Sequence, residues 1–409
     1  MGSTTAPTQE DRAFHLVKPV YAHRSVDRAL AEGRLTEDDA TLIAAFITEQ
    51  QASCSLTTIR VNKLVYLLVN WRRFVGPYRT NAIFDLYTGI NNLKGGTNQR
   101  GKPFKQNTLH DHIILLKRFY LWLIENDIST VPSKKVKAIK APSMDRNTKL
   151  PEQMLTSEEI RALIAAGGNS RDRAFVAVLY ESGCRIGEIG RLSWERVSFD
   201  KHGAVLTVED TKCHKSRHVR LVMSLPYLVA WRNDYPFEPT GRALVFITTR
   251  KTPLQYATAA KILTTLAERA GVKKRVTPHL FRHSRITHLI TQGVTESVIK
   301  LMMWGNLSTD MFQTYAHLAG ADIDREILGH YGVTVAAEAA DQGLEPRECP
   351  ECHTINAPTA RYCTTCYRSL TGESTATIAG MEADIVAHPQ AIRAIVEEMI
   401  NEKKKRGEI

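Results

Sequence analysis

The chain has 409 residues, which is long enough for two or three domains, each with its own apolar core. A formal net charge of +11 makes a polyanion the natural partner, although such charge also occurs in proteins that bind no nucleic acid. Residues 1–25 lack the apolar core of a signal peptide, and no apolar run approaches the length of a membrane span. We therefore expect a soluble, cytoplasmic protein.

The first third of the chain is predicted to be helical. Residues 1–35 are polar, and we expect them to form a partly ordered arm. From Thr36 onward, apolar residues recur at helical spacing in four or five stretches with basic faces, which predicts a compact all-α domain over residues 36–130. Residues 131–151 contain three prolines and several lysines, so we expect an extended basic linker there.

The sequence from 152 to 332 predicts a second domain, rich in helices and with a small antiparallel sheet. It opens with a capping box formed by Thr156 and Glu159. A buried helix then ends at Gly183, and the alternating segment after Gly203 indicates two strands joined by a turn at residues 212–215. The chain is therefore expected to be mainly α.

Four of the seven cysteines form two CxxC pairs. Their spacing, CPEC followed by CTTC, is typical of a zinc ribbon, which we expect over residues 347–370 with Zn²⁺ bound by Cys349, Cys352, Cys363 and Cys366. Four protein ligands leave no open position on the metal, so its expected role is structural. Residues 376–409 are predicted to form a C-terminal helix and tail.

Four motifs between the capping box and the cysteines carry the chemistry. They are Arg185 in ESGCRIGEI, Lys212 in TKCHKSRHV, His279 and Arg282 in HLFRH, and Tyr315 in FQTYAHL. Taken singly, each has an ordinary structural interpretation, for example an ion pair between Arg185 and Glu188. Together, the cations can neutralise a phosphate while the tyrosine supplies a nucleophile.

This set of motifs resembles the signature of tyrosine recombinases, the phage integrase and Xer family. The cysteine module adds a weaker similarity to archaeal integrases with a C-terminal zinc ribbon. The resemblance implies that residues 36–130 form a SAM-like core-binding domain and that residues 152–332 form the catalytic domain. The linker would then run as a strap along the DNA backbone, although a solvated tether is the simpler alternative.

The resemblance also assigns a role to each motif residue. Arg185 and Arg282 would clamp the scissile phosphate, His279 would assist proton transfer, and Tyr315 would attack the phosphorus. Lys212 would protonate the leaving 5′-oxygen, with Lys215 as the second choice. His283 is expected to give structural support only.

One position departs from the family pattern. Nine residues before the tyrosine, where the family commonly has His or Trp, this chain has Asn306. Asparagine can donate a hydrogen bond to a phosphate oxygen, but it cannot carry a positive charge or shuttle a proton. We expect activity to be retained, at a cost on the order of a hundredfold in rate if one phosphate donor is lost.

The implied function is site-specific DNA recombination, for integration, excision or dimer resolution, through a 3′-phosphotyrosyl intermediate. No cofactor is expected for catalysis. The expected partners are double-stranded DNA, three further copies of the chain in a tetramer, and accessory recombination proteins, at the nucleoid. The alternatives are a catalytically decayed DNA-binding regulator on the same scaffold, which Asn306 favours, and DNA relaxation by a type IB topoisomerase.

Overall fold

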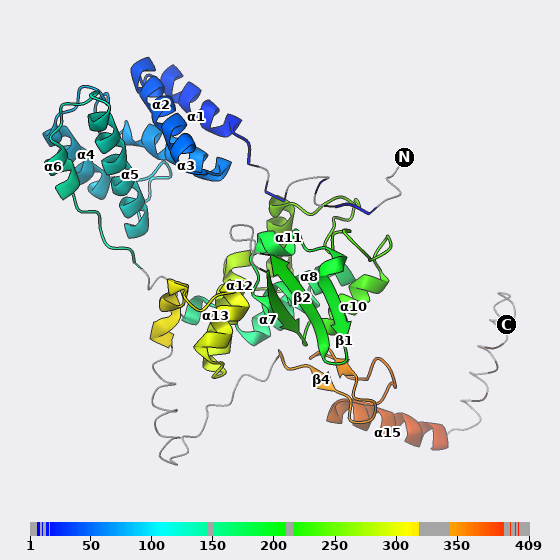
Figure 1. The fold of residues 1–409 in the computed structure, drawn as a ribbon. Coiled ribbons are helices and arrows are strands. Elements are labelled where there is room, and N and C mark those ends of the chain that lie inside the picture. Colours follow the sequence, from blue (N-terminus) through cyan, green and yellow to red (C-terminus); the bar gives the residue numbers. More distant parts are fainter. Residues whose placement is uncertain are drawn as a thin grey trace, which may run out of the picture. The chain divides into compact units, whose positions relative to one another are not determined.

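The computed structural model describes residues 6–8, 10, 14–15, 17–145, 151–209, 216–318 and 344–387, with the isolated positions 393, 397 and 400. The chain forms two compact units. The helical unit comprises Leu16–Thr148, and the mixed unit comprises Met1–His15 together with Lys149–Ile409 (Figure 1). In the described part of the chain, no helix is both long enough and apolar enough to cross a membrane.

The helical unit contains α1 (Val20–Ala31), α2 (Glu37–Ser53), α3 (Thr58–Trp71), α4 (Ile83–Gly95), α5 (Gln106–Glu125) and α6 (Ser133–Ala138). Two of these helices begin with a threonine cap, since Thr36 accepts a hydrogen bond from the Asp39 backbone N–H and Thr57 accepts one from Arg60. Large aromatic side chains, among them Trp71 and Phe119, fill the core.

Two segments of the helical unit differ from the sequence expectation. The range expected to be a partly ordered arm contains α1, which buries Ala22 and Ala29 and packs on α3. An apolar stripe of Ala22, Val26, Ala29 and Leu30 is present there at helical spacing, within a segment that is polar on average. The range expected to be an extended linker contains α6, which is anchored by the fully buried Val136. Residues 146–150 of the expected linker lie outside the described residues.

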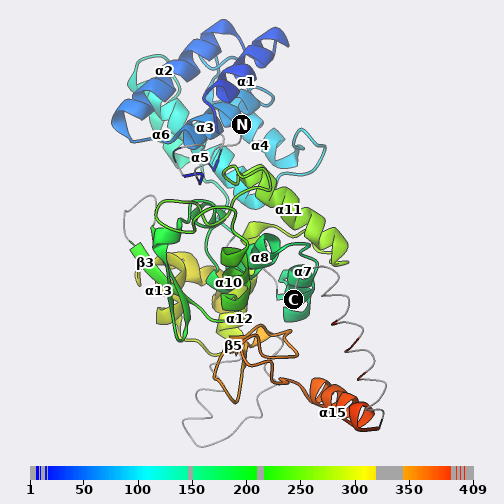
Figure 2. The same ribbon diagram turned by 90° about the vertical axis from the view of Figure 1, so that its right-hand side faces the viewer.

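The mixed unit surrounds the buried helix α8. Its elements are η1 (Pro151–Gln153), α7 (Ser157–Ala165), α8 (Ser170–Ser182), α9 (Ile186–Ile189), η2 (Trp194–Arg196), β1 (Val197–Asp200), β2 (Gly203–Glu209), β3 (Ser216–Leu221), α10 (Leu225–Asn233), α11 (Tyr256–Arg269), α12 (Pro278–Thr291), α13 (Glu296–Trp304), η3 (Asp310–Leu318), β4 (Arg347–Glu348), β5 (Ile355–Asn356) and α15 (Gly372–Ala387). Strands β1, β2 and β3 form one antiparallel sheet in chain order (Figure 2).

Local signals in the sequence position these elements well. The capping box of Thr156 and Glu159 is present at the start of α7, and Gly183 ends α8 in the left-handed conformation at φ 57°. Strands β2 and β3 confirm the predicted hairpin, whose turn lies outside the described residues. The predicted mainly α fold with a small antiparallel sheet is therefore confirmed. The apolar residues expected in the C-terminal helix, Ile392 to Met399, also lie outside the described residues.

The N-terminal segment of the chain packs on the mixed unit. The Pro7 carbonyl accepts a hydrogen bond from the Leu244 N–H at 3.0 Å, and the Phe14 carbonyl accepts one from the Tyr256 N–H at 3.0 Å. The Phe14 ring is buried in the main core and sits on Gly190, where an added Cβ would lie 2.0 Å from the Phe14 Cδ2 atom. Phe14 therefore supports the short stretch of chain that also carries α9.

We expect Phe14→Ala to lower the free energy of unfolding by about 3 kcal/mol, because it removes a buried aromatic ring and leaves a cavity. Denaturant unfolding of the full chain measures this change. Phe84→Ala is the matched control, since that ring is 70% exposed and its loss should cost no more than about 0.5 kcal/mol. Equal effects of the two substitutions would show that Phe14 does not contribute to the core.

Candidate active site

Arg185 is positioned by a sharp turn of the chain between α8 and α9. Gly183 makes this turn possible, since its φ is positive and an added Cβ would lie 2.6 Å from the Met303 Cε atom. The chain then passes through the buried Cys184, and Arg185 caps the N-terminus of α9. The Arg185 side chain is 42% exposed, so its guanidinium remains accessible to a ligand.

Glu188 is the carboxylate that holds this arginine. It accepts hydrogen bonds from the Arg185 backbone N–H at 2.7 Å and from the Arg185 guanidinium at 3.1 Å. Burial alone would raise the pKa of the Glu188 carboxyl, but the hydrogen bond and charge of Arg217, with the Arg185 contacts, hold it below its ordinary value. Glu188 therefore carries a negative charge at neutral pH, as the sequence interpretation of an ion pair requires.

Arg217, which the sequence analysis did not single out, connects three parts of the site. Its guanidinium donates to the Glu188 carboxylate at 2.8 Å and 3.1 Å, and its Nε donates to the Met302 carbonyl at 2.8 Å. The side chain is buried and also approaches the Cys184 Sγ atom at 3.6 Å. The signal was present in the sequence: β3 alternates, and Arg217 shares its buried face with Val219 and Leu221.

Arg282 lies deepest in the site. Thr277 caps α12 and Pro278 opens it, as predicted, which places Arg282 in the second turn of the helix. The guanidinium donates to the Gly183 carbonyl at 2.7 Å and to the Met303 carbonyl at 2.9 Å, and it stacks on the Trp304 ring. Burial, and then the neighbouring charge of Arg185, lower the pKa of Arg282 to about 10. The side chain therefore stays cationic at neutral pH.

Tyr315 lies in η3 and packs against α12. Its ring is buried in a cluster with Ile286 and Trp304, and its hydroxyl forms a hydrogen bond with His283 Nδ1. Burial raises the pKa of Tyr315, whereas the charge of Arg282 lowers it. The phenol is therefore protonated at neutral pH.

The two histidines of the HLFRH motif lie differently from the sequence expectation. His279, the expected proton-transfer residue, is exposed in the first turn of α12, and its ring centre lies 6.4 Å from that of His283. His283, expected to be only supportive, is the residue that contacts the Tyr315 hydroxyl. Neither its position after the arginine nor the helical spacing distinguished this role in the sequence.

Of the remaining two predicted residues, only Asn306 lies within the described part of the chain. Asn306 lies just beyond α13, and its side-chain amide donates to the Trp304 carbonyl at 3.3 Å. Lys212 and its alternative Lys215 lie outside the described residues, between β2 and β3. The structure thus brings together Arg185, Arg282 and Tyr315, and it adds Glu188, Arg217 and His283. Two arginines beside a buried phenol are suited to nucleophilic attack on a phosphodiester.

The four cysteines of the two CxxC pairs come together as predicted from their spacing. Their Sγ atoms all lie within 4.8 Å of one another, and three of the Sγ–Sγ distances are 3.4–3.5 Å. A tetrahedral site with Zn–S bonds of about 2.3 Å separates its sulfur atoms by about 3.8 Å, so the cluster has the size of a metal site. Short strands β4 and β5 pair beside it.

The comparisons with known proteins agree with this geometry. Residues 153–321 match the phage integrase family. The tyrosine recombinase XerD of Neisseria meningitidis is 27% identical over 224 residues, which cover 53% of this chain and 74% of that protein. The tyrosine recombinase XerA of Pyrococcus furiosus is 30% identical over 190 residues, covering 44% and 64% of the two chains.

Solved structures share the fold. The XerH site-specific recombinase, bound to its palindromic difH substrate in a post-cleavage complex, aligns with a TM-score of 0.53 at 14% identity, covering 79% of this chain and 99% of that one. A lambda integrase dimer bound to a COC′ core site aligns with a TM-score of 0.53 at 14% identity, covering 67% and 76%. The match over residues 153–321 contains the arginine and tyrosine motifs, so this part of the chain is similar to the phage integrase family and to the tyrosine recombinases named above.

Proposed function

We propose that this protein is a site-specific DNA recombinase in which Tyr315 cleaves and rejoins DNA. The observation that carries the proposal is the buried Tyr315 hydroxyl, which contacts His283 and lies in the field of Arg282. Attack of the phenolic oxygen on the scissile phosphorus forms a 3′-phosphotyrosyl bond and breaks the bond to the 5′-oxygen. Because one phosphodiester replaces another, the exchange needs no ATP.

The cations of the site stabilise the charge that develops on the phosphate. Arg185, whose side chain is 42% exposed, offers a planar fork of donors that matches two phosphate oxygens, and the buried Arg282 adds a fixed positive charge beside it. His283 is in contact with the nucleophile and can take its proton, while the exposed His279 can reach a phosphate oxygen. Lys212 is assigned to protonate the leaving 5′-oxygen, and Asn306 to donate one hydrogen bond to the phosphate.

The two units are assigned different tasks on the same DNA substrate. The helical unit acts as the core-binding domain, and residues 152–332 of the mixed unit act as the catalytic domain. Strand exchange between two duplexes takes four tyrosines, so the active assembly is a homotetramer on double-stranded DNA. This assembly would work in the cytoplasm at the nucleoid, where accessory recombination proteins can join it.

The test of this proposal is a nicked suicide duplex that carries the attachment site, taken from the DNA flanking the gene. Cleavage releases a short fragment from such a duplex, which prevents religation and accumulates the covalent intermediate. We expect a protein–DNA adduct that survives denaturing electrophoresis. Site binding without any adduct would favour the decayed regulator that Asn306 suggests. Relaxation of plasmid lacking the site would favour a topoisomerase.

The cysteine cluster is proposed to hold one structural Zn²⁺ through Cys349, Cys352, Cys363 and Cys366. The cluster fits this metal because it offers four thiolates and leaves no position for a substrate. The ion would fold a module that is too small to fold on its own core.

We expect a zinc content of one ion per chain, and Cys349→Ser with Cys363→Ser to abolish it. Loss of the metal should expose residues 347–370 to proteolysis, because metal binding and folding of such modules are coupled. Cys54→Ser is the control, since that cysteine is exposed and far from the cluster in sequence. An unchanged metal content in the double variant, measured by mass spectrometry of the native protein, would contradict the assignment.

A further inference from the structure

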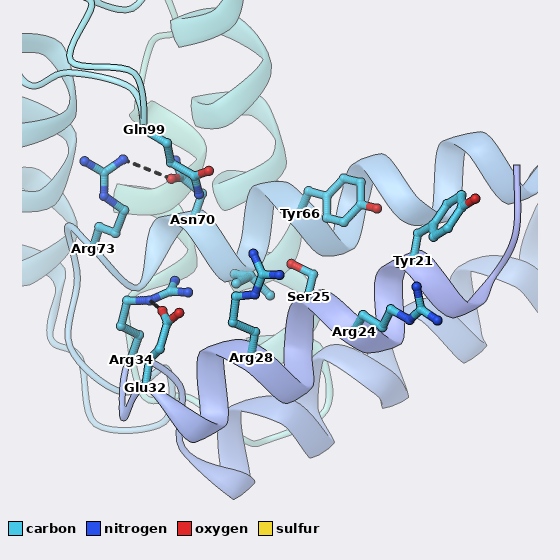
Figure 3. A pocket seen from close by; sticks show the side chains of 11 residues that line it. Tyr21, Arg24, Ser25, Arg28, Glu32, Arg34, Tyr66, Asn70, Arg73 and Gln99 are labelled. Carbon is cyan, nitrogen blue, oxygen red and sulfur yellow. Dashed lines mark hydrogen bonds and ion pairs between the residues drawn. The ribbon is translucent and has the colours of Figure 1, made fainter. Parts of the chain in front are cut away.

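The helical unit contains a groove that the proposed cleavage reaction does not use. It has a volume of about 870 Å³ and lies between α1 and α3 (Figure 3). We call it the α1–α3 groove, and its lining is Tyr21, Arg24, Ser25, Arg28, Glu32, Arg34, Tyr66, Val69, Asn70, Arg73 and Gln99. Four arginines and two tyrosines against a single carboxylate make this lining cationic and aromatic together.

The arginines of the groove differ in how they are held. Arg34 pairs with Glu32 at 2.5 Å, and Arg73 donates to Asn70 and to the Thr97 carbonyl. Arg24 and Arg28 are exposed, and among the described residues neither makes an ion pair. Two adjacent uncompensated cations on one helical face attract an anion that can span one turn of helix.

The two aromatic rings of the groove come from the two helices that flank it. Tyr21 on α1 is 38% exposed and Tyr66 on α3 is 43% exposed. Figure 3 shows Tyr21 and Arg24 at one end of the groove, Arg73 and Gln99 at the other, and Arg28 reaching from α1 toward α3. Tyr21, Arg24 and Arg28 recur every three to four residues, so they line about 10 Å of one face of α1.

We propose that the α1–α3 groove binds a single-stranded segment of DNA, with bases stacked on Tyr21 and Tyr66 and phosphates held by Arg24 and Arg28. A positively charged groove that also presents aromatic rings is the common arrangement for binding single strands, since every base offers a face for stacking. In duplex DNA the bases are already stacked on one another, so exposed tyrosine rings find no free base face there.

This inference rests on the proposed function, because strand exchange separates the bases next to each cleaved phosphate. A strand freed in that way needs a holding site while it changes partners. The helical unit offers such a site apart from the residues that perform the chemistry. Stacking is tolerant of sequence, so the groove can hold the exchanging segment whatever bases it carries.

The test measures binding of a fluorescein-labelled oligothymidine of about eight nucleotides to the full chain by anisotropy over a series of salt concentrations. We expect Tyr21→Ala with Tyr66→Ala to weaken binding by at least about tenfold, with an unchanged salt slope. Arg24→Gln with Arg28→Gln should make the fall of log affinity with log salt less steep by about 1.4, for two lost phosphate contacts.

Two control pairs make the same changes outside the groove. Phe84→Ala with Tyr87→Ala removes exposed aromatics of α4, and Lys94→Gln with Arg118→Gln removes two exposed cations. The aromatic control pair should change the affinity by less than about twofold. The cation control pair should do the same beyond the loss that follows from removing two positive charges anywhere on the chain. The proposal is overturned if the control pairs match the groove pairs, or if a duplex of the same length competes better than the single strand.

The adduct assay on the same preparations separates this proposal from the proposed function. If all the variants still form the covalent adduct on a nicked duplex but bind oligothymidine like the unsubstituted chain, the groove proposal fails and the recombinase stands. If the unsubstituted chain forms no adduct, yet the groove pairs lose oligothymidine, single-strand binding stands without recombination.

Discussion

Tyr315→Phe is expected to abolish the covalent protein–DNA adduct completely. The substitution removes one oxygen and keeps the ring, which is buried against Ile286 and Trp304. The free energy of unfolding should therefore change by no more than about 1.5 kcal/mol, through loss of the hydrogen bond to His283. A phenylalanine at position 315 has no atom that can form a bond to phosphorus. Loss of the adduct in a variant that stays folded would therefore be an effect on the chemical step.

The measurement is the fraction of labelled suicide duplex that migrates with the protein on a denaturing gel. Tyr256→Phe is the matched control, because Tyr256 lies in the same unit and is exposed on α11. We expect this control to form the adduct at the normal rate, and both variants to bind the uncleaved site with normal affinity. An adduct that persists in Tyr315→Phe would assign the nucleophile to another tyrosine.

The fold class and the motifs of the site could be predicted from the sequence because their signals are local. Thr156, Gly183 and Thr277 each have a capping role that depends on residues one turn away. The motifs around Arg185, Arg282 and Tyr315 are similarly short. Such features are settled by neighbours in the chain, and the structure has them where they were expected.

The remaining features depend on contacts between distant segments. The pairing of His283 with Tyr315 joins residues 32 positions apart, and that of Arg217 with Glu188 joins residues 29 apart. Helix α1 packs on α3 through an apolar stripe within a segment that is polar on average. A sequence read alone offers no measure of which distant partner a side chain will meet, so these features were missed or given a lesser role.

Arg217 is expected to be a positioning residue whose loss slows cleavage without weakening the DNA complex. Its guanidinium connects Glu188, which holds Arg185, to the Met302 carbonyl at the end of α13. Arg217→Lys keeps the charge but loses the planar fork, so Glu188 and Arg185 lose their fixed orientation. A displacement of about 1 Å at the phosphate costs on the order of a hundredfold in rate. We expect that loss in single-turnover cleavage of bound duplex, with site affinity unchanged within about threefold.

A purely structural role predicts a different pattern, and Arg171 provides the comparison. Arg171 is a buried arginine of the same unit that pairs with Asp172 at 2.6 Å and donates to the Ile247 carbonyl at 3.1 Å. Arg171→Lys should lower the free energy of unfolding by an amount similar to Arg217→Lys, because each breaks a buried ion pair of good geometry. At a temperature well below the melting temperature of both variants, only Arg217→Lys should slow cleavage. If both variants cleave at the same rate, Arg217 stabilises the fold and does not orient Arg185, the arginine proposed to bind the phosphate.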